Sequence, residues 1–123
     1  MVTRVVIPAL DPSGTTAYAS PTMVQGIIRG ELGFSGAIIT DSLLSPAVLA
    51  GPGPVVAALA ALRAGDDILL LGSGSAVDEQ AIERTIAAVE EAVSLGQITM
   101  ARLNDATLHV LRLKARLGLL AAC

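Results

Sequence analysis

Three short aliphatic runs alternate with longer segments of helical length along the chain. The runs lie at residues 2–7, 37–40 and 67–71, and they contain many β-branched or aliphatic residues with little alternation of polar positions. This pattern is typical of strands that are buried on both faces of a parallel sheet. Because a helical segment follows each run, the chain is expected to form parallel strands joined by helical crossovers.

Helix start and stop signals bound the segments between these runs. Ser20 followed by proline predicts a helix at about residues 21–32, and glycines predict its end and the end of a second helix at about 54–64. Two further helices are predicted, one that ends at Gly96 and one from about Thr99 to Gly118. Their apolar positions should form one buried stripe on each helix. These positions are Ile82, Ile86, Val89 and Val93, and then Leu103, Ala106, Val110, Leu113 and Leu117.

The resulting order of strands and helices predicts an α/β fold, a partial TIM-type (β/α)₈ barrel with parallel strands and flanking helices. A complete barrel needs eight strands and about 250 residues, whereas this chain has 123 residues and three predicted strands. Residues 1–123 are therefore expected to be a single fragment of such a domain. Its open sheet edges and apolar face should lead to self-association or to dependence on a missing N-terminal barrel segment.

Composition narrows the class of partner. Hydrophobic residues make up 53% of the chain, and eight basic against eleven acidic residues give a net charge of −3. Without a basic cluster, nucleic acid is not an expected partner. The uncharged stretch 42–62 contains three prolines, so a loop and a buried helix are favoured over a membrane span. A single cysteine, Cys123, excludes an internal disulfide. No signal peptide is visible, and the localisation stays open between the cytoplasm and export directed by an upstream segment.

The candidate for chemistry is Asp41, which ends the run 37–40 abruptly. A carboxylate at the carboxyl end of a parallel strand lies where such sheets place ligands and catalytic groups. An aspartate in this place can equally cap the next segment. The residue alone therefore leaves both interpretations open.

The residues around Asp41 resemble a known active-site signature. The stretch from Ile27 to Asp41, IIRGELGFSGAIITD, is similar to the signature of the family 3 glycoside hydrolases, and most of all to their bacterial β-N-acetylhexosaminidase branch. The resemblance covers nearly the whole chain but only part of the family's catalytic domain, about its last three βα units. Further similar stretches are residues 6–11, 64–70, 102–104 and 110–114.

This resemblance implies a retaining hydrolysis of O-glycosyl bonds in β-N-acetylhexosaminide-like carbohydrates, with Asp41 as the nucleophile and without a cofactor or metal. A retaining mechanism also needs a group that protonates the leaving oxygen. In the hexosaminidase branch this group is a histidine on an earlier loop, and nothing in this chain matches it. The single histidine, His109, lies in the last predicted helix and is expected to be a surface or packing residue. The isolated chain is therefore expected to be inactive or nearly so.

Two further residues are candidates for substrate binding. Arg4 stands where the family commonly has a histidine, and it could contact a sugar hydroxyl or carboxylate or be an exposed charge at a strand end. Asp11 follows the first run in a loop and could touch substrate, although formation of a turn also explains it. A second departure from the family pattern is Ser45, which stands where a methionine usually follows the nucleophile by four residues.

The remaining charges and the Gly/Ser loop suggest other roles. Arg29 and Glu31 should anchor their helix to its neighbours, and Asp66 and Asp67 precede a strand and should be structural. The stretch Gly72-Ser73-Gly74-Ser75 could expose backbone N–H groups to a phosphate, or it could be a simple connection. The alternatives to an enzyme are thus a non-catalytic assembly module and a sugar- or phosphate-binding module.

Overall fold

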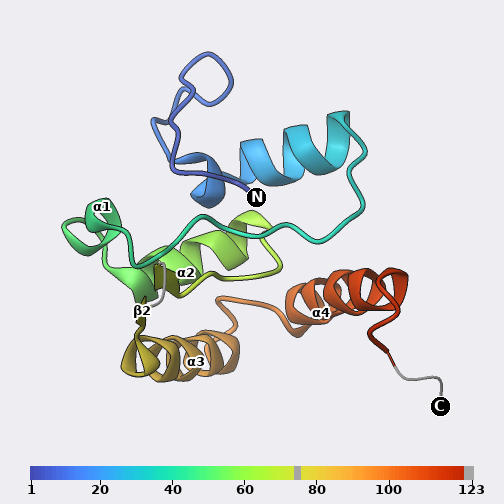
Figure 1. Cartoon of the computed structure of the whole chain (residues 1–123). Coiled ribbons are helices and arrows are strands. Elements are labelled where there is room, and N and C mark those ends of the chain that lie inside the picture. Colours follow the sequence, from blue (N-terminus) through green and yellow to red (C-terminus); the bar gives the residue numbers. More distant parts are fainter. Residues whose placement is uncertain (74–75, 121–123) are drawn as a thin grey trace.

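The computed structural model describes residues 1–73 and 76–120, and these residues form a mostly helical structure (Figure 1). An extended segment, residues 33–45, runs between the N-terminal helix and helix α2, and helices α3 and α4 follow on the other side of α2. The elements are η1 (Ala17–Ala19), η2 (Thr22–Glu31), α1 (Pro46–Leu49), α2 (Pro54–Ala64), β1 (Gly72–Ser73), β2 (Ala76–Val77), α3 (Glu79–Ser94) and α4 (Met100–Arg116).

The predicted partial barrel of parallel strands is wrong for this structure. The runs 2–7, 37–40 and 67–71 form no strand. In the described part of the chain the strands are β1 and β2, which have two residues each and pair with each other in antiparallel orientation. The three aliphatic runs lie side by side, and their backbones form two isolated parallel bridges, Val2 to Thr40 and Ile39 to Ile68.

Hydrogen bonds to η1 and to a side chain explain why these bridges do not extend into a ladder. The carbonyl groups of Thr3 and Val5 accept hydrogen bonds from the backbone of η1, at 3.3 and 2.9 Å, instead of facing a neighbouring strand. The backbone N–H of Leu70 donates to the side-chain oxygen of Thr40 at 3.0 Å, where a ladder would use a carbonyl. Hydrophobic pattern predicts burial and an extended backbone, but regular pairing also needs these backbone groups to be free.

The predicted helices are largely confirmed, because their start and stop signals act as expected. Helix α2 has the predicted bounds, and Ser20 accepts a hydrogen bond from the backbone of Met23 at 3.1 Å at the start of η2. Helix η2 has wide turns, in which the N–H of Leu32 bonds the carbonyl of Ile27 at 2.9 Å. The four predicted stop glycines all have positive φ, the conformation that favours glycine. They are Gly33 (62°), Gly65 (117°), Gly96 (69°) and Gly118 (69°).

The buried stripes of the last two helices are only partly present. Ile86 is 55% exposed and Leu117 is 63% exposed, whereas the small residues Ala92 and Ala106 are buried. The apolar spacing therefore predicted the helices correctly but overestimated how much of their surface is covered. No helix within residues 1–73 and 76–120 has the length and apolar character required to cross a membrane.

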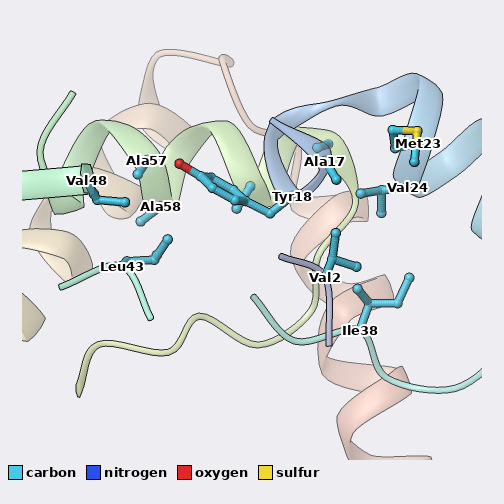
Figure 2. Packing of buried hydrophobic residues seen from close by; sticks show 12 residues of the cluster. Val2, Ala17, Tyr18, Met23, Val24, Ile38, Leu43, Val48, Ala57 and Ala58 are labelled. Carbon is cyan, nitrogen blue, oxygen red and sulfur yellow. The ribbon is translucent and has the colours of Figure 1, made fainter. Parts of the chain in front are cut away.

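The main hydrophobic core lies between η1, η2, α2 and the extended segments. Tyr18 of η1 is 4% exposed, and its ring lies beside Ala57 and Ala58 of α2 (Figure 2). Small residues on this face of α2 allow the ring to approach the helix closely. Val2 and Ile38, which lie in the extended segments, belong to the same buried cluster (Figure 2). The backbone around residue 40 is therefore supported by packed side chains.

A buried carboxylate, Asp67, joins the elements around the start of the third run. Its side chain has no exposed surface, and one oxygen accepts hydrogen bonds from Arg29 at 2.6 Å and from the backbone N–H of Ile38 at 2.9 Å. The other oxygen lies 2.9 Å from the guanidinium of Arg102 and 3.1 Å from Nδ1 of His109. The structural role expected for Asp67 agrees with these contacts.

The two arginines extend this cluster to backbone carbonyls at the ends of other elements. Arg29 donates to the carbonyls of Phe34 and Gly36 at 2.8 and 2.6 Å, which fixes the turn after η2. Arg102 donates to the carbonyl of Leu62 at 3.0 Å and thereby ties α4 to the last turn of α2. Arg29 therefore anchors its helix to its neighbours, as the sequence predicted.

Beside this cluster lies a second buried acid, Asp66, whose carboxyl oxygens have no hydrogen-bond partner in the described structure. Burial, reinforced by the adjacent charge of Asp67, raises the pKa of Asp66 from 3.8 to about 7, and the positive charges of Arg102 and Arg29 oppose this rise. Asp66 is therefore protonated in the folded protein under mildly acidic conditions.

We predict that replacing Asp67 by asparagine lowers the free energy of unfolding by about 3–5 kcal/mol, the usual cost of breaking a buried ion pair. The substitution leaves two guanidinium groups without their buried counter-charge. Urea denaturation followed by circular dichroism measures the effect. The matched control is Asp105→Asn, because Asp105 is 55% exposed and pairs with Arg102 at the surface. The control should cost less than about 1 kcal/mol, and equal losses in both variants would contradict the assigned role of Asp67.

We also predict that Asp66 makes stability fall as the pH rises. The unfolded chain releases the Asp66 proton near its ordinary pKa of 3.8, whereas the folded chain keeps it until about pH 7. Between these values the folded state binds more protons, so the free energy of unfolding decreases with rising pH and becomes level above about 7. Denaturation midpoints from pH 4.5 to 8 test this, with Asp66→Asn as the comparison. If parent and variant show the same slope, the prediction is wrong.

Candidate active site

Backbone contacts with both neighbouring runs position Asp41. Its N–H donates to the carbonyl of Val2 at 2.8 Å, and the preceding Thr40 is fully buried and donates its N–H to the carbonyl of Ile68 at 3.0 Å. The three aliphatic runs therefore meet at the residue just before Asp41. This arrangement fixes the place from which its carboxylate projects.

The carboxylate of Asp41 has one oxygen engaged and one facing a cation. Oδ1 accepts a hydrogen bond from the backbone N–H of Ser42 at 2.8 Å. Oδ2 lies 3.6 Å from Nε of Arg4, and the side chains of Asp41 and Arg4 are 33% and 35% exposed. A nucleophile must be oriented and also reachable, and this carboxylate is both. The structure thus brings two of the predicted site residues together.

Ser42 belongs to this site, although its role was not predicted from the sequence. Its hydroxyl donates to the carbonyl of Gly72 and accepts a hydrogen bond from the N–H of Leu44 at 3.2 Å. Ser42 thereby ties the loop after Asp41 to the end of the third run. Its position directly after the candidate nucleophile was the signal available in the sequence.

The third predicted site residue, Asp11, has its carboxyl group engaged in a turn. One oxygen accepts a hydrogen bond from the N–H of Ser13 at 3.0 Å, and the other accepts one from the hydroxyl of Ser20. The hydrogen bonds from Ser20 and then Ser13 lower the pKa of Asp11. These contacts support the turn interpretation, and no ion pair or hydrogen bond joins Asp11 to Asp41 within the described residues. Contact with a substrate stays a prediction.

His109 lies in the buried charge cluster, where its ring contacts other charged groups. Nδ1 is 3.2 Å from the guanidinium of Arg29 and 3.1 Å from Asp67, and Nε2 is 3.9 Å from Asp105. Asp67, Asp105 and His109 have the spacing of a metal site, with ligand atoms within 4.8 Å of one another. The carboxylate of Asp67 already faces two arginines, whose positive charges oppose a cation there. The cluster is therefore best explained as an ion-pair network.

The candidate phosphate loop is only partly described. Gly72 and Ser73 form strand β1, whereas Gly74 and Ser75 lie outside the described residues. The interpretation of this loop as a phosphate site therefore stays a prediction from the sequence.

The sequence of this chain is similar to parts of two larger glycosidases. A β-hexosaminidase of Stenotrophomonas maltophilia (strain K279a) is 35% identical over 79 residues, which cover 64% of this chain and 23% of that protein. A periplasmic β-glucosidase of Salmonella typhimurium is 31% identical over 112 residues, covering 87% of this chain and 13% of that protein. The chain thus spans less than a quarter of the length of these curated relatives.

A solved structure shows the same similarity in three dimensions. The family 3 β-N-acetylglucosaminidase from Paenibacillus sp. str. FPU-7 superposes with a TM-score of 0.83 at 30% sequence identity. The match covers 94% of this chain and 21% of that protein. Residues 1–113 also match the family model described as glycosyl hydrolase family 3 N terminal domain. This chain therefore belongs to glycosyl hydrolase family 3, within the N-terminal domain of that family.

Proposed function

We propose that this chain supplies the nucleophile for retaining hydrolysis of O-glycosyl bonds in β-N-acetylhexosaminides, as part of a complete catalytic domain. The observation that supports this proposal is the orientation and exposure of the Asp41 carboxylate. Its carboxylate is held at the meeting point of the three runs, oriented by Ser42 and one-third exposed to solvent. Membership of the family, and the β-hexosaminidase among its relatives, support the choice of substrate.

We infer different roles for the two carboxylate oxygens from their contacts. Oδ1 is engaged by the N–H of Ser42, so Oδ2 is the oxygen that attacks the anomeric carbon. The bond from this carbon to the leaving oxygen breaks as the bond to Oδ2 forms, and water later releases the sugar. Arg4, 3.6 Å from Oδ2, provides a positive charge beside the attacking oxygen.

The reaction also needs an acid that protonates the leaving oxygen, and no such acid lies near Asp41 among the described residues. The ring of His109 contacts Asp67 and Arg29 in the buried cluster, and this contact supports the packing role expected for it. We therefore expect the isolated chain to turn over ordinary glycosides very slowly, because their leaving groups need an acid. A substrate whose leaving group needs no acid isolates the contribution of Asp41.

We predict that the chain forms a covalent adduct with 5-fluoro-N-acetyl-β-glucosaminyl fluoride. Fluoride leaves without protonation, and the ring fluorine slows hydrolysis of the glycosyl-enzyme. Intact-mass spectrometry should show one added sugar on the parent chain and none on Asp41→Asn.

The matched control for this experiment is Asp105→Asn, which removes an exposed carboxylate in helix α4. It should form the adduct as the parent does, and peptide mapping should place the sugar on Asp41. An adduct that persists in Asp41→Asn, or its absence from the parent, would count against Asp41 as the nucleophile.

A second candidate function, self-association, follows from an uncovered apolar cleft. A cavity of about 430 Å³ lies between α3 and the run 67–71, and its lining includes Ile68, Ile82 and Ile86. Ile86 lines this cleft and is 55% exposed. Exposed apolar clefts of this kind are typical of protein–protein contacts, and we propose a second copy of the chain as the partner.

We predict that the chain sediments as a dimer or larger species and that Ile86→Glu weakens this association at least tenfold, because it places a charge in the cleft. Analytical ultracentrifugation over a range of concentrations measures the effect. Leu32→Glu is the matched control, because Leu32 is 73% exposed and lies outside the cleft. A monomeric parent would rule out this candidate.

A further inference from the structure

Arg4 combines a buried donor with an accessible guanidinium group. Its Nε atom is buried and has no hydrogen-bond partner in the described structure, although the side chain as a whole is 35% exposed. The separation of 3.6 Å from Oδ2 of Asp41 is an ion-pair distance that exceeds a normal N–H···O hydrogen bond. The donor capacity of Arg4 is therefore incompletely used.

The backbone around Arg4 is held in place by its neighbours. Thr3 and Val5, on either side of it, accept hydrogen bonds from η1 at 3.3 and 2.9 Å. Val2 accepts the N–H of Asp41 at 2.8 Å. Arg4 is thus presented from a fixed segment directly beside the candidate nucleophile. The other acid near the end of this run, Asp11, has its carboxyl group engaged by Ser13 and Ser20.

A planar guanidinium group with unused donors is suited to recognise a carboxylate, because its fork of N–H groups matches the two carboxylate oxygens. A negatively charged substituent would otherwise be repelled by Asp41, and the positive charge of Arg4 offsets this repulsion. A neutral sugar hydroxyl accepts a weaker hydrogen bond, because it lacks the opposite charge that strengthens the contact with a carboxylate. The site should therefore favour an acidic sugar over the neutral sugar of the same shape.

We propose that Arg4 determines substrate class by binding a carboxylate on the sugar that occupies the Asp41 site, so that the preferred ligand is an acidic, uronic-acid type of N-acetylhexosaminide. This inference rests on the proposed function for the location of the sugar. It does not depend on the covalent step.

The test compares two ligands that differ only at C6. Isothermal titration calorimetry at pH 7 measures binding of methyl 2-acetamido-2-deoxy-β-D-glucopyranoside and of the corresponding C6 carboxylate. The parent chain should bind the carboxylate at least tenfold more tightly. The preference should disappear in Arg4→Gln and persist in part in Arg4→Lys, which keeps the charge but loses the planar fork.

The matched control is Arg112→Gln, which removes an equal charge from the exposed face of α4 and should leave the preference unchanged. Asp41→Asn should bind the carboxylate ligand more tightly than the parent, because it removes the competing negative charge. If Asp41→Asn binds the carboxylate ligand more tightly but the parent chain forms no covalent adduct, the role of Asp41 as nucleophile is refuted and the role of Arg4 in binding is retained. If the parent chain forms the adduct but binds the two sugars equally, the role of Asp41 is retained and the role of Arg4 is refuted.

Three results would overturn the proposal. They are equal binding of the two sugars by the parent, a preference that survives Arg4→Gln, and binding of inorganic phosphate alone with the same affinity and the same dependence on Arg4. The last result would show a general anion site. Circular dichroism of each variant confirms that the comparison is made between folded chains.

Discussion

The buried carboxylate of Asp67 is the interaction on which the arrangement of this chain depends. It faces two guanidinium groups, a histidine ring and a backbone N–H, which come from η2, α4 and the segment before Asp41. Removing a charge from water is costly, and only such a complete set of partners compensates for the cost. With few large side chains in the core, and many alanines on α2, these directional contacts supply positional precision that packing alone would not.

The same cluster determines where the candidate active site lies. Asp67 holds the N–H of Ile38, and Asp41 follows three residues later along an extended backbone, roughly 10 Å away. Structural charges and candidate catalytic charges therefore occupy opposite ends of one short segment. This separation explains why the chain contains two groups of acids with different surroundings. The side chains of Asp66 and Asp67 are buried, whereas that of Asp41 is partly exposed beside Arg4.

Much of this organisation could be predicted from local sequence signals. Helix bounds followed from Ser20, from the prolines and from stop glycines, because these residues act through their own backbone and nearest neighbours. The three aliphatic runs were predicted to be parallel strands, and this prediction was wrong, because only isolated bridges join the described residues of these runs. Whether a carbonyl such as that of Val5 bonds a strand or η1 is a tertiary choice that hydrophobic pattern does not encode. The position of His109 inside the Asp67 cluster was likewise decided by contacts across 42 residues of sequence.

The pairing of Arg4 with Asp41 shows how a departure from a family pattern gains meaning from geometry. In the sequence, an arginine in place of a histidine was compatible with an exposed charge at the end of a run. In the structure, its Nε is buried without a partner and its guanidinium group faces the oxygen of Asp41 that is left free by Ser42. The charge of Arg4 acts on every ligand that reaches Asp41. Both side chains are partly buried, so solvent ions screen this charge less than they screen a fully exposed one. This placement is the basis of our proposal that Arg4 favours a negatively charged sugar.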